Sequence, residues 1–214
     1  TVNHEWKRWS SRIKARLLAH HKFPAYTLTD GSRFLELYDL INQEKYDFLD
    51  GYTNAIYLFA DYMENHGLSF SHKLQYVFTT AENLHPFQRQ TIEKMIAPVY
   101  DSYGSSEING VAYECPACQC YHVIDPHVYV EFGEVADDSG SRELLITDLD
   151  NYAFPLIRYK LGDLAIPGPS GCKCPVPFTS LAAVTGRQSD IITLSDGGTL
   201  SVPSCFGSML LRQI

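Results

Sequence analysis

Apolar side chains recur at helical spacing along the first half of the chain. The periodicity predicts helices over residues 6–19, 32–43 and 54–65, and a fourth that begins near Pro86. A short apolar run over 75–79 predicts a buried strand, and Val99 and Tyr100 begin another. Helices and strands therefore alternate up to Glu107, which predicts a layered α/β fold with parallel strands.

The pattern changes in the second half to one typical of antiparallel strands. Residues 128–132 and 143–147 alternate between apolar and polar side chains, and an acidic turn that contains Gly140 joins them, as in an antiparallel pair. The remaining expected elements are a Pro-, Gly- and Cys-rich loop over 167–177, a linker from Val184, a strand over 191–194 and a turn over 196–198. The predicted organisation is an α/β part over 1–123, an antiparallel subdomain over 124–187, and a hinge with the start of a further domain over 188–214.

The composition is that of an ordinary globular protein, with 45% hydrophobic and 20% charged residues among 214. A net charge of −8 argues against nucleic-acid binding, which needs a clustered basic face. No apolar run approaches the roughly 20 residues that span a membrane, and the N-terminus lacks the apolar core of a signal peptide. We therefore expect a cytoplasmic location, in which cysteines are thiols or metal ligands. Because the chain lacks an initiator Met and residues 210–214 end like a cut helix, we expect a piece of a larger protein.

Five of the six cysteines fall into two short segments. In the first, a Cys-Pro-Ala-Cys turn aims two sulfurs at one point, as in a zinc knuckle, and the second supplies a Cys-Lys-Cys pair. The expected ligands of a structural Zn²⁺ ion are Cys115, Cys118, Cys172 and Cys174. His122 or Cys120 can replace one of them, and the alternative without a metal is a set of buried thiols or a redox pair. Cys205 stands alone and is expected to be an ordinary thiol.

Three further segments carry side chains suited to a nucleotide. A Tyr-Gly-Ser-Ser-Glu turn offers an aromatic face for a base, hydroxyls for phosphate and a carboxylate, Glu107, for Mg²⁺. Asp163 follows a Gly at the expected end of an apolar strand, where a carboxylate can accept two hydrogen bonds from a ribose diol. Arg187 follows a Gly in an expected loop and suits phosphate or ribose. Taken singly, each segment is more often an ordinary turn.

In order, the motifs Tyr-Gly-Ser-Ser-Glu, Arg-Tyr-x-x-Gly-Asp and Thr-Gly-Arg-x-x-Asp resemble the adenylate-forming acyl/aryl-CoA synthetase superfamily. Within it, the chain is similar to the phenylacetate–CoA ligase and CapK-like branch, in which the two cysteine segments recur. The resemblance covers roughly residues 45–200. It implies an α/β fold that forms part of the large N-terminal domain of such an enzyme. That fold is a layered α/β structure with a small antiparallel β subdomain and a zinc-bound loop.

The resemblance also implies a role for individual residues. Those that would line the nucleotide site are Thr80, Ala81, Glu82, Asp101, Ser102, Tyr103, Gly104, Ser105, Ser106, Asp163 and Arg187. Asp101 and Tyr103 would meet the adenine, Ser106 the α-phosphate and Asp163 the ribose hydroxyls. Glu107 would hold Mg²⁺, and together with Arg187 it would act in catalysis.

The chemistry that the resemblance implies has two steps. A carboxylic acid attacks the α-phosphate of ATP to give an acyl-adenylate and pyrophosphate, and CoA or another thiol then displaces AMP. Such chemistry depends on positioning and charge neutralisation, which agrees with the lack of a nucleophilic triad in the sequence. Tyr52 and Tyr57 would favour an aromatic acid, whereas Phe59 is expected in the core. The expected partners are the acid and CoA, with a homodimer as the candidate assembly.

The chain also departs from the family pattern. The Gly/Ser/Thr-rich loop that handles the β- and γ-phosphates is expected before Thr1, and the late catalytic Lys beyond the last residue. Ser189 stands at the hinge where the family usually has an acidic residue. These departures leave open a non-catalytic, zinc-clamped binding or interaction module with the same fold. A zinc-ribbon nucleic-acid binder is disfavoured by the acidic charge.

Overall fold

The computed structural model of the protein describes residues 22–24, 31–137, 139–169, 172–193 and 199–201. The helix predicted over 6–19 and the turn over 196–198 lie outside these residues, as does Cys205. The described helices are α2 (Gly31–Glu44), α3 (Thr53–Asn65), α4 (Pro86–Met95) and the short 3₁₀-helix η2 (Gln188–Asp190). The strands are β1 (Phe48–Tyr52), β2 (Tyr76–Thr80), β3 (Val99–Tyr103), β4 (Ala112–Glu114), β5 (Tyr121–Val123), β6 (Val128–Val135), β7 (Arg142–Asp148), β8 (Tyr159–Pro167), β9 (Ser180–Arg187), β10 (Ile191–Thr193) and β11 (Thr199–Ser201).

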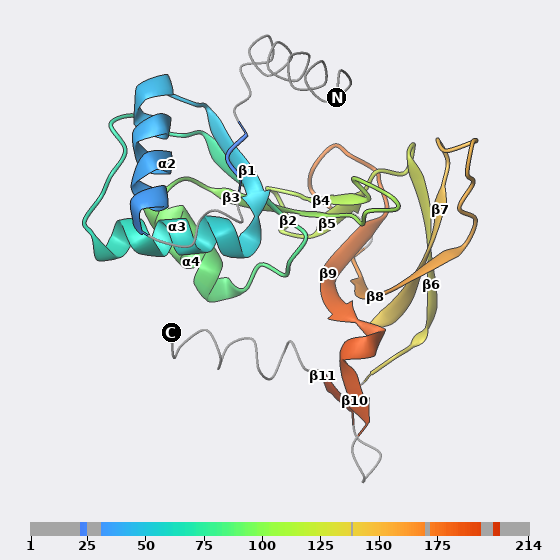
Figure 1. Cartoon of the computed structure of the whole chain (residues 1–214). Coiled ribbons are helices and arrows are strands. Elements are labelled where there is room, and N and C mark those ends of the chain that lie inside the picture. The colour runs from blue at the N-terminus through green and yellow to red at the C-terminus, as the bar shows by residue number, and fades with distance from the viewer. Residues whose placement is uncertain (1–21, 25–30, 138, 170–171, 194–198, 202–214) are drawn as a thin grey trace, which may run out of the picture.

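Within the described residues, nine strands form one sheet in the order β1-β2-β3-β4-β5-β9-β8-β7-β6 (Figure 1). Strands β1, β2 and β3 are parallel, and α3 and α4 make the crossover connections between them. All other neighbours in this sheet are antiparallel. We call β1 to β3 the parallel part and β4 to β9 the antiparallel part. The predicted mixed α/β fold is confirmed, with its parallel strands first.

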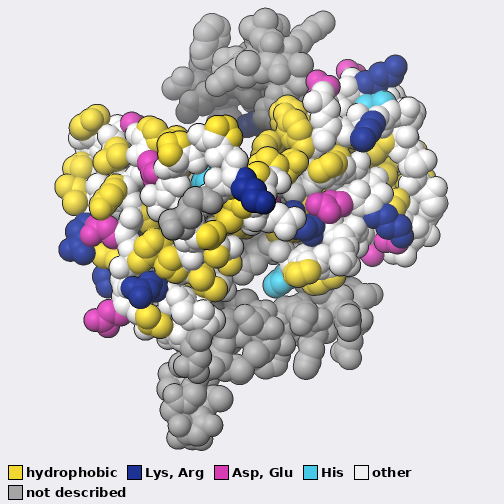
Figure 2. Space-filling model, turned by 180° about the vertical axis from the view of Figure 1, so that it is seen from behind, with side chains coloured by type: hydrophobic (Ala, Val, Ile, Leu, Met, Phe, Trp, Pro, Cys, Tyr) yellow, Lys and Arg dark blue, Asp and Glu magenta, His cyan; other side chains and the backbone are white. Residues whose placement is uncertain are grey.

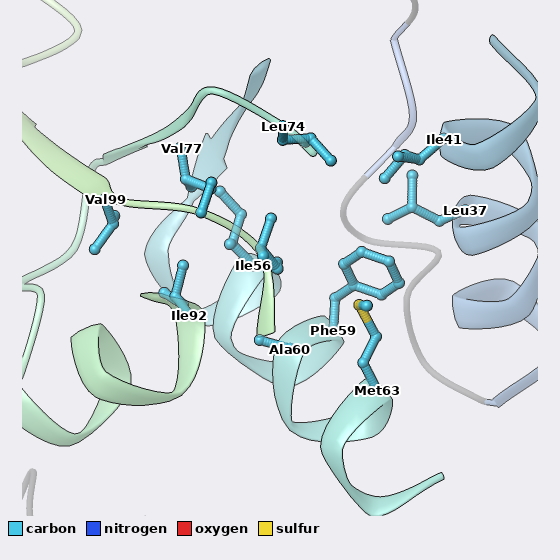
Figure 3. Packing of buried hydrophobic residues seen from close by; sticks show 12 residues of the cluster. Leu37, Ile41, Ile56, Phe59, Ala60, Met63, Leu74, Val77, Ile92 and Val99 are labelled. Atoms are coloured by element: carbon cyan, nitrogen blue, oxygen red, sulfur yellow. The ribbon is translucent and has the colours of Figure 1, made fainter. Parts of the chain in front are cut away.

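Helices α3 and α4 cover one face of the parallel part. Strands β2 and β3 bury every second residue, so Val77 and Val99 point toward the helices. Phe59 and Met63 of α3 are fully buried in the same cluster, beside residues of α2 (Figure 3). Full burial of each such side chain contributes about 1.5–3 kcal/mol. The helices predicted over 32–43, 54–65 and from Pro86 are confirmed to within one residue at the ends that were predicted.

A second hydrophobic cluster holds the antiparallel part together. Val130, Leu144 and Ile146 belong to it, and they lie on the paired strands β6 and β7. The strands predicted over 128–132 and 143–147 are therefore confirmed. The linker predicted from Val184 is wrong, because Val184 lies inside β9 and pairs with Ala165 of β8. Small and polar residues dominate β9, so its sequence carries little strand signal.

The sheet continues without a break across residue 123, because β5 pairs with β4 on one side and with β9 on the other. The division of the chain into 1–123, 124–187 and 188–214 stays a prediction. The pair β10–β11 forms a separate two-stranded sheet after η2, and β10 agrees with the strand predicted from Ile191.

Hydrophobic side chains also gather on the outer surface of the antiparallel part, as the view from behind shows (Figure 2). Tyr152, in the connection between β7 and β8, is 89% exposed, and Phe154 and Ile157 in the same connection are exposed as well. Among the helices of the described part, none has the length and apolarity needed to cross a membrane.

Candidate functional site

A pocket of about 220 Å³ lies where the carboxyl ends of β2 and β3 meet β8 and β9. We call it the central pocket. Its lining residues are Ala81, Glu82, Asn83, Asp101, Ser102, Tyr103, Gly104, Tyr121, Asp163, Val184, Gly186 and Arg187. Most were predicted for the nucleotide site, so the fold brings together motifs that are far apart in sequence. A larger and more open hollow of about 430 Å³ lies along α2 and contains no predicted site residue.

Asp163 and Arg187 face each other as register partners of β8 and β9. Arg187 Nε lies 3.3 Å from Asp163 Oδ1, and the Tyr103 hydroxyl donates a 2.8 Å hydrogen bond to Oδ2. Burial raises the pKa of the Asp163 carboxyl, which is only 7% exposed, although Tyr103 and Arg187 partly oppose the effect. Burial and the Asp163 charge also raise the pKa of Tyr103, so its hydroxyl stays protonated and donates.

The local setting of these two residues differs from the expectation. Asp163 was expected at the end of a strand, and Arg187 in a loop. Asp163 instead lies inside β8, and Arg187 is the last residue of β9. Gly162 makes this possible, because its φ of 77° is a left-handed conformation that glycine adopts without strain. The irregular β8–β9 register also begins next to Asp163, so pattern alone did not reveal a continuous strand.

Asp101 is a buried carboxylate on the opposite wall of the pocket. Thr79 Oγ1 donates to its Oδ1 at 2.6 Å, and the Tyr121 hydroxyl donates to its Oδ2 at 2.6 Å. Burial raises the pKa of Asp101, and these two hydrogen bonds offset only part of the shift. Tyr121 was not predicted as a site residue, because it adjoins the cysteine motif in sequence and reaches the pocket only through the pairing of β4 and β5.

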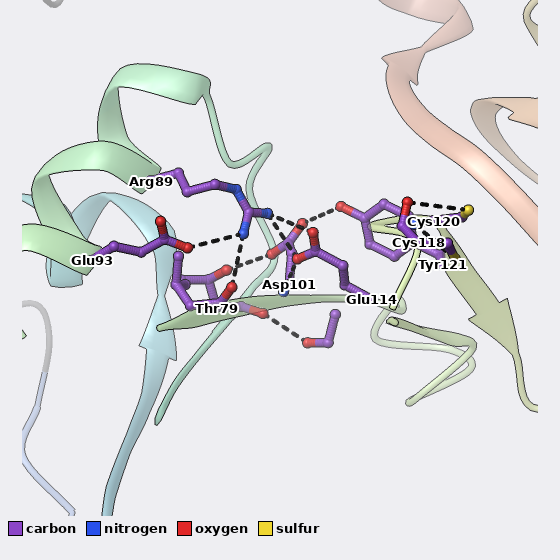
Figure 4. A network of polar contacts seen from close by, with 10 residues as sticks. Thr79, Arg89, Glu93, Asp101, Glu114, Cys118, Cys120 and Tyr121 are labelled. Carbon is purple, nitrogen blue, oxygen red and sulfur yellow. Dashed lines mark hydrogen bonds and ion pairs between the residues drawn. The ribbon is translucent and has the colours of Figure 1, made fainter. Parts of the chain in front are cut away.

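Behind Asp101 lies a second layer of polar contacts (Figure 4). The Asp101 backbone N–H donates to Glu114 Oε2 at 2.9 Å. Arg89 of α4 donates from one nitrogen to both oxygens of Glu114, each at 2.8 Å, and from another to the Val99 carbonyl at 2.8 Å. This network joins α4, β3 and β4 beneath the floor of the pocket.

The turn after β3 has no room for a side chain at Gly104. A Cβ on Gly104 would lie 2.8 Å from the Gly110 nitrogen. The Ser105 hydroxyl accepts hydrogen bonds from the backbone N–H groups of Glu107 and Ile108, so it shapes the turn. The predicted residues that do not line the pocket are Thr80, Ser105, Ser106 and Glu107. Ser106 and Glu107 are exposed.

Glu82 lines the pocket and also has a structural contact. Its carboxylate accepts the backbone N–H of Asn54 at 2.8 Å, at the start of α3. A carboxylate at a helix N-terminus is favourable because it faces unpaired N–H groups. Ala81, its neighbour, has a φ of 69°, an unusual conformation for a residue with a Cβ. The loop after β2 is therefore held in a specific shape.

The two cysteine segments meet beside the β4–β5 hairpin. The residues that could offer ligand atoms within 4.8 Å of one another are Cys115, Cys118, His122 and Cys172. Cys174, expected in place of His122, has its sulfur 3.2 Å from His122 Nε2. We call these five residues the cysteine cluster. Cys120 is buried nearby, and its Sγ approaches the Cys118 carbonyl at 3.6 Å.

The geometry of the cysteine cluster suits a metal. The sulfurs of Cys115 and Cys172 are 3.7 Å apart, far beyond the roughly 2.05 Å of a disulfide. A zinc ion with Zn–S bonds of about 2.3 Å separates its sulfurs by roughly 3.8 Å. A backbone N–H from Cys174 lowers the pKa of the Cys172 thiol to about 7. His122 Nδ1 is buried without a hydrogen-bond partner among the described residues, and a buried nitrogen of this kind needs a partner.

The aromatic residues proposed for an acid pocket lie outside the central pocket. Phe59 is fully buried, which confirms its expected place in the core. Tyr57 packs edge-on against Phe87 with ring centroids 5.4 Å apart, and Tyr52 is 54% exposed. A role for the two tyrosines in acid binding stays a prediction.

Comparison of the sequence with known proteins finds relatives over part of the chain. No family model matches the chain. Phenylacetate-coenzyme A ligase of Pseudomonas putida is 32% identical over 147 residues, which are 63% of this chain and 32% of that protein. Protein CapK of Staphylococcus aureus is 29% identical over 136 residues, which are 63% of this chain and 29% of that protein. The chain therefore spans about a third of the length of these relatives.

Solved structures show the same fold. 2-Hydroxyisobutyryl-CoA ligase, in its postadenylation state with 2-HIB-AMP, matches with a TM-score of 0.73 at 19% identity. The match covers 96% of this chain and 45% of that one. Amide bond synthetase McbA of Marinactinospora thermotolerans matches with a TM-score of 0.54 at 18% identity, over 78% of this chain and 37% of that one. The predicted resemblance is confirmed: in sequence the chain is similar to acid–CoA ligases and CapK, and in fold it is similar to ligases of the adenylate-forming superfamily.

Proposed function

We propose that the protein is an AMP-forming acid ligase of which this chain carries the AMP-binding core. The full protein would use ATP and Mg²⁺ to convert a carboxylic acid into an acyl-adenylate and pyrophosphate. It would then transfer the acyl group to CoA or another acceptor. The acid is the open part of the proposal, with an aromatic acid suggested by Tyr52 and Tyr57. The named activities of the curated relatives, acid–CoA ligation among them, support this class of reaction.

The observation that carries the proposal is the convergence of Tyr103, Asp163 and Arg187 on one pocket. A carboxylate, an aromatic ring and a guanidinium match the ribose, base and phosphate of a nucleotide. Ligand sites in α/β sheets lie at the carboxyl ends of the strands, as this one does. Its volume of about 220 Å³ is below the roughly 300–1,000 Å³ of drug-sized sites, which fits a site for the nucleoside part.

Each residue would act through binding and charge rather than as a nucleophile. Asp163 would accept the ribose hydroxyls once Arg187 turns toward the phosphate. Arg187 and Mg²⁺ held by Glu107 would neutralise charge that develops on the α-phosphate as the acid attacks. Glu107 is exposed. Burial is the main cause of the raised pKa of Asp163, and the Glu107 charge adds to it.

We also propose a structural Zn²⁺ in the cysteine cluster. Cys115, Cys118 and Cys172 would be three of its ligands, and either His122 or Cys174 the fourth. The 3.7 Å sulfur separation and the unpaired His122 Nδ1 support a metal over free thiols. A set of four protein ligands leaves no open position, so the ion would stabilise the fold and take no part in the reaction.

The nucleotide part is tested by AMP binding to the intact protein. AMP should raise the melting temperature, because a ligand at a hundredfold excess over its Kd adds about 2.7 kcal/mol to the free energy of unfolding. Asp163→Asn should abolish the shift. Glu143→Gln is the matched control. Glu143 is a carboxylate that forms an ion pair with Lys160, which lies on β8 like Asp163, and it does not line the pocket. An unchanged shift in Asp163→Asn would remove Asp163 from the site.

The reaction is tested by pyrophosphate release from ATP with a panel of aliphatic and aromatic acids. Release with at least one acid would support the ligase. AMP binding without release for any acid would instead favour the second candidate, a zinc-clamped binding or interaction module. The specific observation behind that candidate is the cysteine cluster, which is structural in character and adjoins the pocket.

A further inference from the structure

The β4–β5 hairpin connects the cysteine cluster with the central pocket. Glu114 and Tyr121 are register partners and form the last pair of the hairpin ladder. Directly after that pair comes the loop that carries Cys115 and Cys118. Hydrogen bonds from Cys115 N to Cys120 O at 2.7 Å and from Gln119 N to Cys115 O at 2.8 Å close this loop. The position of the last pair therefore depends on how the loop is held.

Both members of this pair bind Asp101 (Figure 4). The Tyr121 hydroxyl donates to the Asp101 carboxylate at 2.6 Å, and the Asp101 backbone N–H donates to Glu114 at 2.9 Å. One residue thus orients the carboxylate while the other holds the main chain. Thr79 donates to the second carboxylate oxygen. The Ser102 backbone N–H donates a third hydrogen bond to this carboxylate. Because a carboxylate has about four acceptor sites, one is left for a ligand.

Glu114 is itself anchored away from the hairpin. Arg89 of α4 contacts both of its oxygens at 2.8 Å, and the Glu114 side chain is almost completely buried. The hairpin is therefore attached to the helical layer at one member of the pair. The other member of the pair, Tyr121, lines the central pocket. A shift of the cysteine loop would move the Tyr121 hydroxyl relative to the Asp101 carboxylate, whose other oxygen Thr79 holds in place.

We propose that Tyr121 and Glu114 are positioning residues for Asp101, and that the cysteine cluster sets the base selectivity of the pocket through them. The inference rests on the proposed nucleotide binding and adds a regulator of the same site. An Asp101 carboxylate in the pocket wall accepts a hydrogen bond from an exocyclic amino group and repels a carbonyl oxygen. Its orientation therefore favours an adenine over a hypoxanthine base.

The test compares the Kd of AMP and of inosine monophosphate in the intact protein. The wild type should prefer AMP, and Tyr121→Phe should reduce that preference by roughly tenfold, the equivalent of one hydrogen bond to a charged group. Tyr113→Phe is the control, because Tyr113 lies one residue before Glu114 on β4 and is 42% exposed. A merely structural role for Tyr121 would weaken both nucleotides alike and leave their ratio unchanged, which would overturn the inference.

The link to the cysteine cluster is tested by Cys172→Ser, alone and combined with Tyr121→Phe. Cys172 lies on the distant loop, so its loss alters the cluster without altering the hairpin sequence. Alone, it should also reduce the preference for AMP, and in the Tyr121→Phe background it should add little. Additive effects, or an unchanged ratio in Cys172→Ser, would overturn the link. If the wild type binds neither nucleotide, the proposed function fails. If the wild type prefers AMP and the variants prefer it to the same extent, only this inference fails.

Discussion

Asp163 is the point at which three separate segments of the chain meet. Tyr103 reaches it from β3 and Arg187 from β9. The Arg187 side chain is 67% exposed, and an exposed ion pair of this kind is worth about 0–1 kcal/mol. Little stability is therefore lost if the guanidinium turns toward a phosphate. Tyr103 is buried and stays protonated, so it is the partner that keeps the carboxylate in place.

The pKa of Asp163 leads to a prediction about pH. Burial raises it above the ordinary value of 3.8 in the folded protein. The folded state therefore binds the proton more tightly than the unfolded state does. Below 3.8 the carboxyl is protonated in both states, and as the pH rises through the raised pKa the wild type pays for an ionised buried group. As the pH rises through this range, the free energy of unfolding of the wild type should therefore fall relative to that of Asp163→Asn.

Melting temperatures of the two proteins between about pH 3.5 and about pH 7 provide the measurement. Loss of the hydrogen bond with Tyr103 offsets the two curves by a constant, so only their difference in slope matters. A difference that does not change with pH would contradict the raised pKa.

At the scale of elements, the loop between β2 and α4 ties the helical layer to the pocket. Glu82 accepts an N–H at the start of α3, and Ala81 beside it has a φ of 69°. Gln88, in the first turn of α4, is fully buried. It accepts the His85 backbone N–H at 3.0 Å and donates to Asn54 of α3 at 2.8 Å. One amide thus joins the end of this loop, at His85, to the start of α3, at Asn54.

Gln88→Leu should therefore destabilise the protein, although it changes the volume of the side chain very little. It removes the hydrogen bonds to the half-buried His85 N–H and to Asn54 Oδ1, and each lost hydrogen bond costs about 0.5–1.5 kcal/mol. Gln90→Leu is the control on the same helix, because Gln90 is exposed. It should change stability by no more than about 0.5 kcal/mol. Urea unfolding measures both, and equal effects would exclude this role for Gln88.

At the scale of the whole molecule, a single sheet joins two hydrophobic cores. The central pocket lies along the line where the parallel and antiparallel parts meet. The cysteine cluster lies beside the same line, and it joins the β4–β5 hairpin to the loop before β9. The cluster would thus hold in register the strands that carry Asp101, Asp163 and Arg187.

A metal in the cysteine cluster makes a direct prediction for the intact protein. Elemental analysis of reduced protein should find about one zinc per chain, and a chelator should lower the melting temperature because metal binding contributes to folding. Cys172→Ser should lose the metal. Cys205→Ser should keep it, since the sequence assigns that residue as an ordinary thiol. Reduced protein without metal, and with an unchanged melting temperature in the chelator, would exclude the zinc proposal.

Much of this architecture is local in origin and is therefore readable in the sequence. The helices around Phe59 and Ile92 show their apolar stripes directly, and the parallel strands follow from the alternation of elements. The cysteine segments and the three nucleotide motifs are contiguous groups, so their residue types indicate chemistry before any fold is known. Eight of the predicted nucleotide residues indeed line the pocket.

Only the tertiary structure decides what depends on pairing between distant strands. Strand β9 has weak strand propensity and exists because β5 and β8 pair with it on either side. Tyr121 becomes a pocket residue because β4 and β5 place it opposite Glu114. The sequence left open whether His122 replaces a cysteine ligand, and only the fold brings its ring within 4.8 Å of the Cys115, Cys118 and Cys172 sulfurs. The sequence by itself determined the helices, the motifs and the resemblance to a family. The partners of Asp101 and Asp163 came from the tertiary structure, because periodicity records which face of an element is buried and not which element covers it.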